Sequence, residues 1–525
     1  MLAAVRSAAL VGIDAYDVIV EVDAAAGLPQ WTIVGLAAGA VKESRERVGA
    51  ALLNSGFDVP PRRITVNLAP ADIRKEGTAF DLPIALGILV ATGQLQADSL
   101  HDRLFVGELG LDGALRTVRG ALSMARHALR TRVSSLILPP ANVAEASRVS
   151  ALSLSAPSCL RDLVQELREG NLSETCAGPI VDISEVDASD FADVVGQQGA
   201  KRALEVAAAG GHNVLLIGPP GAGKTMLARR MPSILPCLSE EEALEVIAIH
   251  SVAGVLDNTS VSKGVRPFRA PHHTISSAGL IGGGPAPRPG EVSLAHNGVL
   301  FLDEMLEFPR HVLDGLRQPM EDAKVVIARA TQVVSYPARF TLIGASNPCP
   351  CGRAGDPSGA CNCAPGDIDR YASKISGPLA DRIDMHVVVG AVALRDLSGA
   401  SGGDGSMAVR TRVERARTTQ RNRFAKKRGV SCNAYASGRW LDAHTPVHAE
   451  ARGLLQTAAE RLSLSARGYH RVLKVARTIA DLEDAKEISP VHIGEALRYR
   501  PMTKTIGSTA PERQLQRMGS EKSEA

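Results

Sequence analysis

The segment Gly218-Pro-Pro-Gly-Ala-Gly-Lys-Thr225 decides the fold of this chain. It follows an apolar strand predicted at Asn213–Ile217 and precedes a helix predicted at Met226–Met231. Glycines let backbone amides turn toward a phosphate without a Cβ atom in the way, and a helix N-terminus adds partial positive charge. The lysine suits the β- and γ-phosphates, and the hydroxyl after it suits Mg²⁺. We therefore predict a loop that binds ATP and Mg²⁺ through Gly218, Pro219, Pro220, Gly221, Ala222, Gly223, Lys224, Thr225 and Met226.

A second motif, Gly298-Val-Leu-Phe-Leu-Asp-Glu304, supplies the acidic half of the same site. Its apolar run predicts a buried strand, and parallel sheets bind ligands at the carboxyl ends of their strands. Asp303 is then placed to hold Mg²⁺ together with Thr225. Glu304 is placed to polarise the attacking water, because phosphoryl transfer depends mainly on a positioned nucleophile.

Two further candidates follow along the chain. A strand predicted at Phe340–Ala345 leads to Asn347, whose amide can hydrogen-bond both the lytic water and the γ-phosphate. Arg382 follows in Gly377-Pro-Leu-Ala-Asp-Arg-Ile-Asp384, and an arginine in such a place often reaches the phosphate of a neighbouring subunit. Spacing alone favours instead a surface salt bridge with one of the two flanking aspartates.

Composition limits the classes of function. Aromatic residues are 3% of the 525 residues, too few for a single-strand binder built on base stacking. The net charge is +3, so any contact with a polyanion has to be local. No apolar run reaches the roughly 18–20 residues that span a bilayer, and acidic residues from Asp14 onward interrupt a signal-peptide-like start. We expect a cytoplasmic protein without membrane contact.

The chain is predicted to be a multidomain α/β protein. We expect an α/β domain over residues 1–168, a polar linker over 169–190, a core with a parallel sheet over 191–395, a helical domain over 407–503 and a disordered tail over 504–525. Strands of the first domain are predicted at Val18–Val22, Trp31–Val34, Ile64–Leu68, Leu104–Glu108 and Ser134–Leu138, and its helices at Val41–Leu53, Leu82–Ala91 and Ala121–Leu129. A capping box of Ser239 and Glu242 opens a core helix predicted at Glu240–Ile249. The last domain has helices predicted at Ala449–Leu462, Gly468–Leu482 and Val491–Tyr499.

Four cysteines form two C-x-C pairs, Cys349 with Cys351 and Cys361 with Cys363. In a reducing compartment such a cluster indicates a metal rather than disulfides. Four thiolates can hold a structural Zn²⁺ tetrahedrally and fix the loop after Asn347. The spacing is tighter than the usual C-x₂₋₄-C, and reduced thiols in an ordered loop are the alternative.

A basic run, Arg410–Arg428, holds nine basic residues and one acidic residue, Glu414. Two interpretations stay open. The run is either a solvated helix face that contacts an acidic neighbouring subunit or a surface that contacts phosphates.

Longer motifs resemble those of a known family. The segments Arg266-Pro-Phe-Arg-Ala-Pro-His-His-Thr274, Gly282-Gly-Gly284, Pro289-Gly-Glu-Val-Ser-Leu-Ala-His-Asn-Gly298 and Asn347-Pro-Cys-Pro-Cys-Gly352 resemble the magnesium-chelatase-like AAA+ proteins of the ComM/YifB group. Ser465-Ala-Arg-Gly-Tyr-His-Arg471 and Ala476-Arg-Thr-Ile-Ala-Asp481 resemble the C-terminal lid of the same group. The resemblance covers residues 1–503.

This resemblance implies an ATP-hydrolysing homo-hexamer with nucleotide sites between subunits. It implies that Asn347 is a first sensor, that Arg467 is a second sensor, and that Arg382 acts on the ATP of the neighbouring subunit. It also implies a pore insertion near Gly279–Glu291 beside a hairpin at Ala323–Ala338, where the candidate DNA contacts are Arg288, Lys324 and Arg329. Members of the group act on single-stranded or branched DNA, driving branch migration of recombination intermediates in natural transformation, and recombination proteins are the implied partners.

The N-terminal domain resembles the α/β domain of Lon-type proteases, a ribosomal S5 type 2 fold. Its segment Lys75-Glu-Gly-Thr-Ala-Phe-Asp-Leu-Pro83 has no serine at the nucleophile position, and Arg119-Gly-Ala-Leu-Ser-Met124 offers no lysine. Peptidase chemistry needs a nucleophile beside its base, so we expect a docking or scaffold domain. The alternative function for the whole chain is a chelatase- or MoxR-like ATPase that remodels a partner protein.

Overall fold

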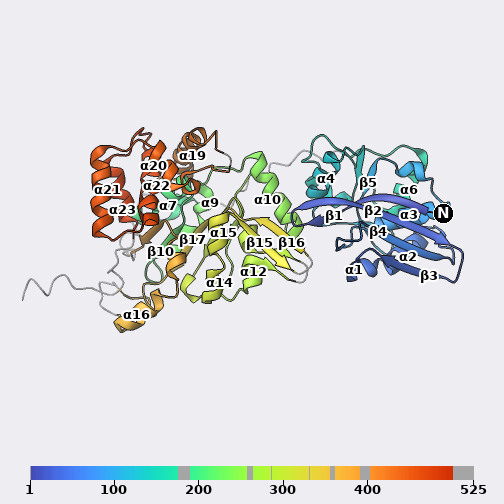
Figure 1. Cartoon of the computed structure of the whole chain (residues 1–525), viewed down its shortest axis with the longest axis horizontal. Helices are drawn as coiled ribbons and strands as arrows, with labels where there is room; N and C mark the ends of the chain where they lie inside the picture. Colours follow the sequence, from blue (N-terminus) through green and yellow to red (C-terminus); the bar gives the residue numbers. More distant parts are fainter. Residues whose placement is uncertain are drawn as a thin grey trace, which may run out of the picture.

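The computed structural model describes residues 2–175, 190–256, 264–284, 287–329, 332–354, 361–390, 403–427 and 429–500. An N-terminal α/β lobe forms one end of the molecule, and the core with its C-terminal helices forms the other (Figure 1). The predicted linker lies mostly outside these residues, and the predicted tail lies wholly outside them. No helix in the described ranges is long and apolar enough to cross a membrane.

A four-stranded sheet forms the base of the N-terminal lobe. Its order is β1-β2-β4-β3, with β3 and β4 parallel and the other pairs antiparallel. Helix α3 is buried along its whole length against β1 and β2. Gly87 permits this close approach, because a Cβ atom there would lie 2.5 Å from Val22 Cγ2. The strands are β1 Leu2–Val11, β2 Asp14–Ala25, β3 Gln30–Val34 and β4 Arg63–Ala69, and the helices are α1 Gly39–Lys42, α2 Ser44–Asn54, α3 Asp81–Ala91, α4 Ala121–Arg130, α5 Val143–Ala146 and α6 Leu160–Glu169.

Two smaller sheets complete this lobe. Some of the elements predicted for the lobe differ from those in the structure. The predicted strand Leu104–Glu108 is divided, because Gly107 bonds to the backbone of Ala79 and Leu82 instead of continuing a ladder. The predicted helix Val41–Leu53 is interrupted at Glu43, and strand β1 was not predicted. The parallel sheet contains β5 Arg103–Phe105, β8 Ser135–Ile137 and β9 Ser153–Ser155, and the antiparallel pair is β6 Glu108–Leu109 with β7 Leu115–Arg116.

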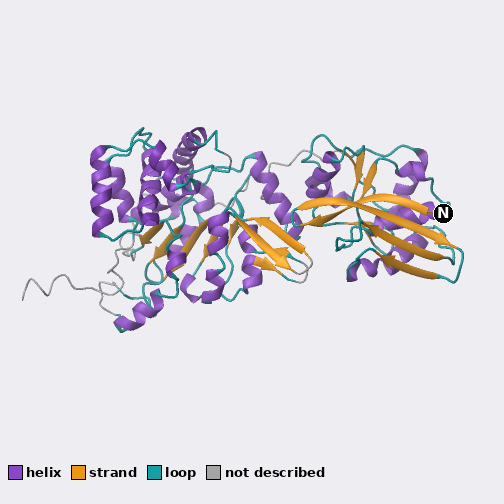
Figure 2. Ribbon diagram, viewed as in Figure 1, coloured by secondary structure: helices purple, strands orange, loops and turns teal. Residues whose placement is uncertain are grey.

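The core is a five-stranded parallel sheet in the order β11-β14-β17-β10-β18. Its strands are β10 Val214–Ile217, β11 Phe268–Arg269, β14 Val299–Leu302, β17 Thr341–Ser346 and β18 Met385–Val388. Alternate strand residues enter two separate apolar clusters, so helices cover both faces of the sheet (Figure 2). The core helices are α7 Gln198–Gly210, α8 Lys224–Arg229, α9 Met231–Ile234, α10 Glu240–Ala253, α12 Ser277–Ile281, α13 Glu291–Leu294, α14 Arg310–Asp314, α15 Arg317–Asp322, α16 Pro365–Ala372 and α17 Gly377–Ala380.

Two hairpins extend from the core. One pairs β12 Gly282–Gly283 with β13 Arg288–Pro289 inside the predicted insertion. The other pairs β15 Lys324–Arg329 with β16 Gln332–Pro337, which confirms the predicted hairpin. Tyr336 Oη donates to the carbonyl of Pro287 at 2.8 Å and so links the two hairpins.

The C-terminal helices pack on the core through α7 and α9. They are α19 Ser406–Arg423, α20 Gly438–His444, α21 Ala449–Arg461, α22 Ala466–Leu482 and α23 Pro490–Arg498. Much of the basic run lies on α19, and four of its arginines bond within the chain: Arg410 to Ser233 O, Arg412 to Glu205, Arg417 to Ala208 O and Arg423 to Asp481. These contacts favour a structural role for that part of the run; Arg428 lies outside the described residues.

An apolar cluster joins the two lobes. It includes Leu122 of α4 and Val246 of α10. At its edge the Gly120 amide donates to Ser251 Oγ at 2.7 Å. Helix α10 begins with the predicted capping box and continues to Ala253, where Gly254 in the left-handed conformation ends it. The N-terminal lobe is therefore anchored on the core through α10.

Candidate functional site

The phosphate loop lies at the carboxyl edge of the central sheet, directly after β10. Gly218 lies so close to Val389 that a Cβ atom there would collide with the Val389 carbonyl oxygen. Gly221 and Gly223 have φ values of 78° and 85°, a conformation that side chains with a Cβ rarely adopt. The predicted helix begins at Lys224 and ends at Arg229, two residues earlier at each end than expected.

Lys224 connects the loop to the neighbouring strand. Its Nζ donates to the carbonyl oxygens of Gly218 at 2.6 Å and Pro219 at 2.9 Å, and to Asn347 Oδ1 at 3.2 Å. Burial lowers the pKa of this ammonium group, and the charges of Asp303 and Glu304 act in the opposite direction. Lysine, asparagine and carboxylates thus converge as the sequence predicts.

A pair of oxygen donors fits the predicted Mg²⁺ site. Thr225 Oγ1 donates to Asp303 Oδ2 at 2.8 Å, so a hydroxyl and a carboxylate lie side by side at the start of α8. Mg²⁺ prefers such oxygen ligands together with substrate phosphates. When bound there, the ion neutralises charge that develops on the β- and γ-phosphates.

Glu304 extends into the open part of the site. Its backbone adopts a left-handed conformation at φ 48°, and its amide donates to Asp303 Oδ1 at 3.0 Å. The side chain is 59% exposed, and Glu304 Oε2 lies 3.7 Å from His273 Nδ1. His273 is a neighbour that the sequence analysis did not identify, although the motif that contains it was noted. Gln197 was also missed, and its amide donates to the carbonyls of Ala222 at 3.2 Å and Gly390 at 2.6 Å.

Arg382 lies at the opposite edge of the sheet. It precedes β18, and its carbonyl oxygen accepts a hydrogen bond from Asn213 Nδ2, just before β10 begins. The four residues of β10 separate this edge from the phosphate loop by about 13 Å. The salt bridge expected from spacing is not formed with either flanking aspartate, because the guanidinium pairs with Glu321 and donates to Pro378 O at 2.8 Å.

Arg467 lies in the C-terminal helices. It is an exposed residue near the start of α22, one helical turn before Arg471, which pairs with Asp384 at 3.7 Å. Among the predicted site residues, the structure therefore brings together Lys224, Thr225, Asp303, Glu304 and Asn347. Among the described residues, neither Arg382 nor Arg467 contacts this phosphate loop.

The four cysteine sulfurs all lie within 4.8 Å of one another. Cys349 Sγ is 3.3 Å from Cys351 Sγ and 3.8 Å from Cys361 Sγ, and Cys351 Sγ is 3.6 Å from Cys361 Sγ. A tetrahedral zinc with Zn–S bonds of about 2.3 Å requires sulfurs about 3.8 Å apart, so the donor set fits. The backbone amide of Arg353 and the neighbouring thiols lower the pKa of Cys351 to about 6. At Cys361 and Cys363 backbone hydrogen bonds also act to lower the pKa, but desolvation and the neighbouring thiols outweigh them, so both pKa values are raised instead.

This cysteine cluster packs against the ATP site. Gly352 lies between Cys351 and the phosphate loop with φ 78°, and a Cβ atom there would lie 2.7 Å from Pro220 Cδ and 3.8 Å from Asn347 Cγ. The position of the cluster therefore bears on both the phosphate loop and the asparagine beside it.

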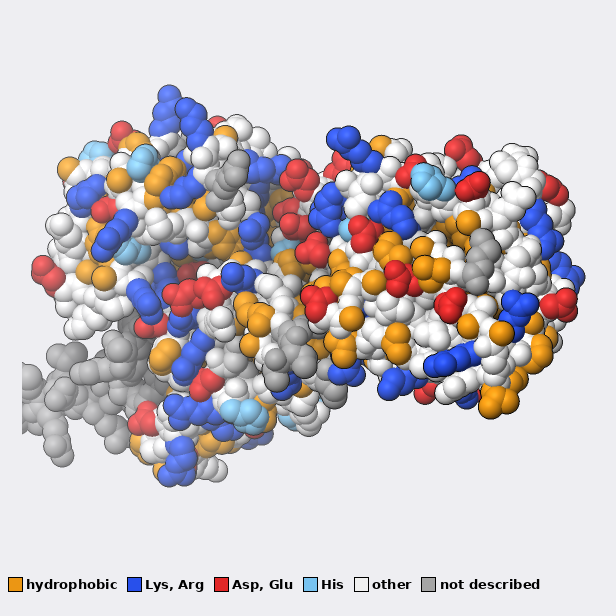
Figure 3. Space-filling view, turned by 45° about the vertical axis from the view of Figure 1, so that its right-hand side comes forward, with side chains coloured by type: hydrophobic (Ala, Val, Ile, Leu, Met, Phe, Trp, Pro, Cys, Tyr) orange, Lys and Arg blue, Asp and Glu red, His pale blue; other side chains and the backbone are white. Residues whose placement is uncertain are grey.

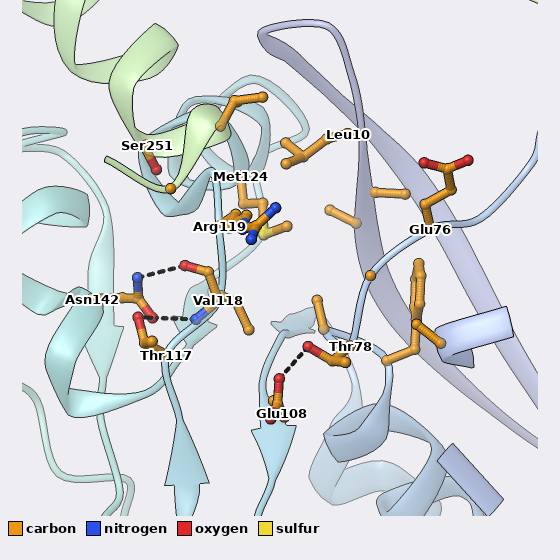
Figure 4. A pocket seen from close by; sticks show the side chains of 18 of the residues that line it. Leu10, Glu76, Thr78, Glu108, Thr117, Val118, Arg119, Met124, Asn142 and Ser251 are labelled. Atoms are coloured by element: carbon orange, nitrogen blue, oxygen red, sulfur yellow. Dashed lines mark hydrogen bonds between the residues drawn. The ribbon is translucent and has the colours of Figure 1, made fainter. Parts of the chain in front are cut away.

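A separate hollow of about 840 Å³ lies between the N-terminal lobe and the core. Figure 4 shows Arg119, Glu76 and Ser251 around it, with Thr78 donating to Glu108. No phosphate-loop residue lines it. The stretch that resembles the nucleophile segment of Lon proteases contributes residues 76–80, which include Thr78 but no serine. The hollow is distinct from the ATP site.

The core and its site define an ATPase of the AAA+ class. A phosphate loop, an Asp-Glu pair and an asparagine meet at the carboxyl edge of a parallel sheet, and a helical domain packs beside them. Models of three magnesium-chelatase regions match the chain: subunit ChlI of Mg-chelatase over residues 20–142, magnesium chelatase subunit ChlI over 190–397 and its C-terminal region over 403–500.

Full-length relatives extend this match to nearly the whole chain. Competence protein ComM of Haemophilus influenzae is 44% identical over 512 residues, which cover 96% of this chain and 98% of that protein. YifB of Salmonella typhimurium is 43% identical over the same shares of the two chains. Lon protease 2 of Bacillus subtilis is 31% identical over 36% of this chain and 37% of its own length. The chain belongs to the ComM/YifB family of magnesium-chelatase-like proteins.

Two substitutions should separate nucleotide binding from hydrolysis. Lys224→Ala should lose both, because it removes the cation beside the terminal phosphates. Glu304→Gln should keep binding but lower kcat about a hundredfold or more, since Asp303 and Thr225 remain while the attacking water loses its base. Fluorescent-ATP binding and phosphate release measure the two properties, and near-parental hydrolysis by either variant would contradict the site.

Proposed function

We propose that the chain is the subunit of a hexameric motor that uses ATP hydrolysis to move DNA strands and drive branch migration. The main support is the separation between Arg382 and the phosphate loop of its own chain. Arg382 lies at the amino edge of the sheet, and β10, about 13 Å long, separates that edge from the phosphate loop. This placement favours action on the γ-phosphate of a neighbouring subunit. A closed ring supplies such a neighbour to every site.

Subunit mixing tests this arrangement. Arg382→Ala alone should hydrolyse ATP roughly a thousandfold more slowly, the usual contribution of an arginine finger. Mixing it with Lys224→Ala should restore part of the activity, because an intact arginine from one subunit then serves an intact phosphate loop in the next. Absence of recovery in rings shown to be mixed would place Arg382 in a structural role.

Local cations support the DNA part of the proposal. Positive and negative side chains are interspersed over the face drawn in Figure 3, which agrees with the small net charge. Arg288 and Arg329 are exposed, and neither pairs with a carboxylate among the described residues. Both lie beside Gly283, since Arg288 is its partner in register and a Cβ on Gly283 would lie 3.7 Å from Arg329 Nη2. A 44% identical relative is named a competence protein.

Lys324 does not belong to this group. It starts β15, whereas Arg329 ends it, so the two residues are about 17 Å apart along the strand. Arg288 and Arg329 are therefore replaced together, and Lys324, the third candidate, is replaced separately on the same hairpin for comparison.

DNA binding should weaken steeply as salt rises, with a log–log slope of about −0.7 per contacted phosphate on single strands. Replacing Arg288 and Arg329 together by Ala should flatten that slope, whereas Lys324→Ala should change it less. Anisotropy of labelled single-stranded DNA with an ATP analogue measures the slope. ATPase activity that responds to a protein and never to forked or single-stranded DNA would favour the protein-remodelling alternative.

We also propose that the four cysteines hold one structural Zn²⁺, which fixes the loop that contacts Pro220 and Asn347. Purified protein should contain about one zinc per chain by mass spectrometry, as expected for a closed tetrahedral site. The double variant Cys351→Ser/Cys361→Ser should lose the metal and melt at a lower temperature. Cys237→Ser, an exposed cysteine outside the cluster, is the matched control. Equal zinc in the parent and the double variant would overturn the assignment.

A further inference from the structure

We propose that Asn213 is a positioning residue that holds Arg382 in place for the neighbouring subunit's ATP. The inference rests on the proposed action of Arg382 between subunits. Asn213 lies immediately before β10, at the amino edge of the sheet, and no nucleotide motif includes it.

Asn213 bonds to two adjacent structural elements through its side chain. Its Nδ2 donates to the carbonyl oxygen of Arg382 at 3.1 Å. Its Oδ1 accepts from the amide of Leu342 at 2.8 Å, within the strand that leads to Asn347. A side-chain amide carries a donor and an acceptor on separate atoms, so it can bond to both backbone segments at once.

The backbone of Asn213 completes the junction. Its amide donates to Asp384 Oδ2 at 3.1 Å, and its carbonyl accepts from the amides of Asp384 and Met385, each at 3.0 Å. Arg382 is therefore held from both sides, with its carbonyl on Asn213 and its guanidinium on Glu321 and Pro378. A change at Asn213 should free the backbone that carries the guanidinium.

Asp384 extends the junction to the C-terminal helices. Its carboxylate lies 3.5 Å from His212 Nδ1 and 3.7 Å from Arg471 Nε, and His212 Nε2 lies 2.8 Å from Thr478 Oγ1. Burial opposes ionisation of Asp384, yet the hydrogen bond and charge of His212 with nearby cations lower its pKa to about 2. The carboxylate is thus charged at neutral pH and ties α22, which carries Arg467, to the same point.

One partly buried junction at Asn213 and Asp384 therefore joins four segments. They are strand β10, strand β17, the segment of Arg382 and helix α22. Movement of α22 or β17 at one subunit's ATP site can reach the Arg382 that serves the next site. The linked residues contact one another directly through hydrogen bonds and an ion pair.

The test uses two variants of full-length protein. Asn213→Asp keeps the acceptor for Leu342 and removes the donor to Arg382, and Asn213→Ser is too short to make either bond. Both should lower kcat at least tenfold while the affinity for fluorescent ATP stays within twofold of the parent. Asn142→Asp is the matched control, because Asn142 makes the same pair of bonds, to the backbone of Val118, in the N-terminal lobe.

Subunit mixing distinguishes positioning from general damage to the sheet. Asn213 variants should recover activity when mixed with Lys224→Ala, which supplies intact Arg382, and should not recover with Arg382→Ala. If Arg382→Ala is rescued by Lys224→Ala but neither Asn213 variant is, the positioning role is overturned while the proposed ring survives. If Arg382→Ala itself is not rescued, action between subunits fails, and this inference fails with it. Parental kcat in both Asn213 variants also overturns it.

Discussion

The direction of strand β10 in the central sheet determines at which edge the phosphate loop and Arg382 lie. Strand β10 bonds in parallel to β17 on one side and to β18 on the other, so all three strands end at the same edge. That edge carries the phosphate loop and Asn347, whereas the start of β18 at the opposite edge carries Arg382. The hydrogen-bond register therefore places Arg382 and the phosphate loop of one chain at opposite edges of the sheet. This separation is the basis of the proposed action of Arg382 on the ATP of a neighbouring subunit.

Helix α10 links the ATPase core to the N-terminal lobe. Its apolar face enters a cluster with α4, while His250 Nε2 lies 2.9 Å from the carbonyl of Leu294, in the helix that precedes β14. The hairpin β15–β16 approaches the N-terminal lobe through Gly12, where a Cβ atom would lie 2.9 Å from Val334 Cγ1. The N-terminal lobe therefore contacts both a core helix and the hairpin β15–β16.

Motifs with fixed local geometry could be identified from sequence. The glycines around Lys224, the apolar run before Asp303 and the capping box at Ser239 each carry their structure within a few residues, and the structure shows all three. Predicted elements were wrong where contacts with a distant segment determine the local structure. Gly107 does not continue the predicted strand, because its backbone groups bond to Ala79 and Leu82. The residues around Gly107 do not indicate these bonds.

The sequence by itself determined the ATP site, the parallel core and the family, because phosphate chemistry demands specific residues at short spacings. Only the tertiary structure decided which charges meet. It paired Arg382 with Glu321 instead of a flanking aspartate, engaged four arginines of the basic run inside the chain, and separated Lys324 from Arg329. It also assembled the four thiols and gave Asn213 its partners. These contacts join residues far apart in the chain, so strand order and packing set them rather than any local pattern.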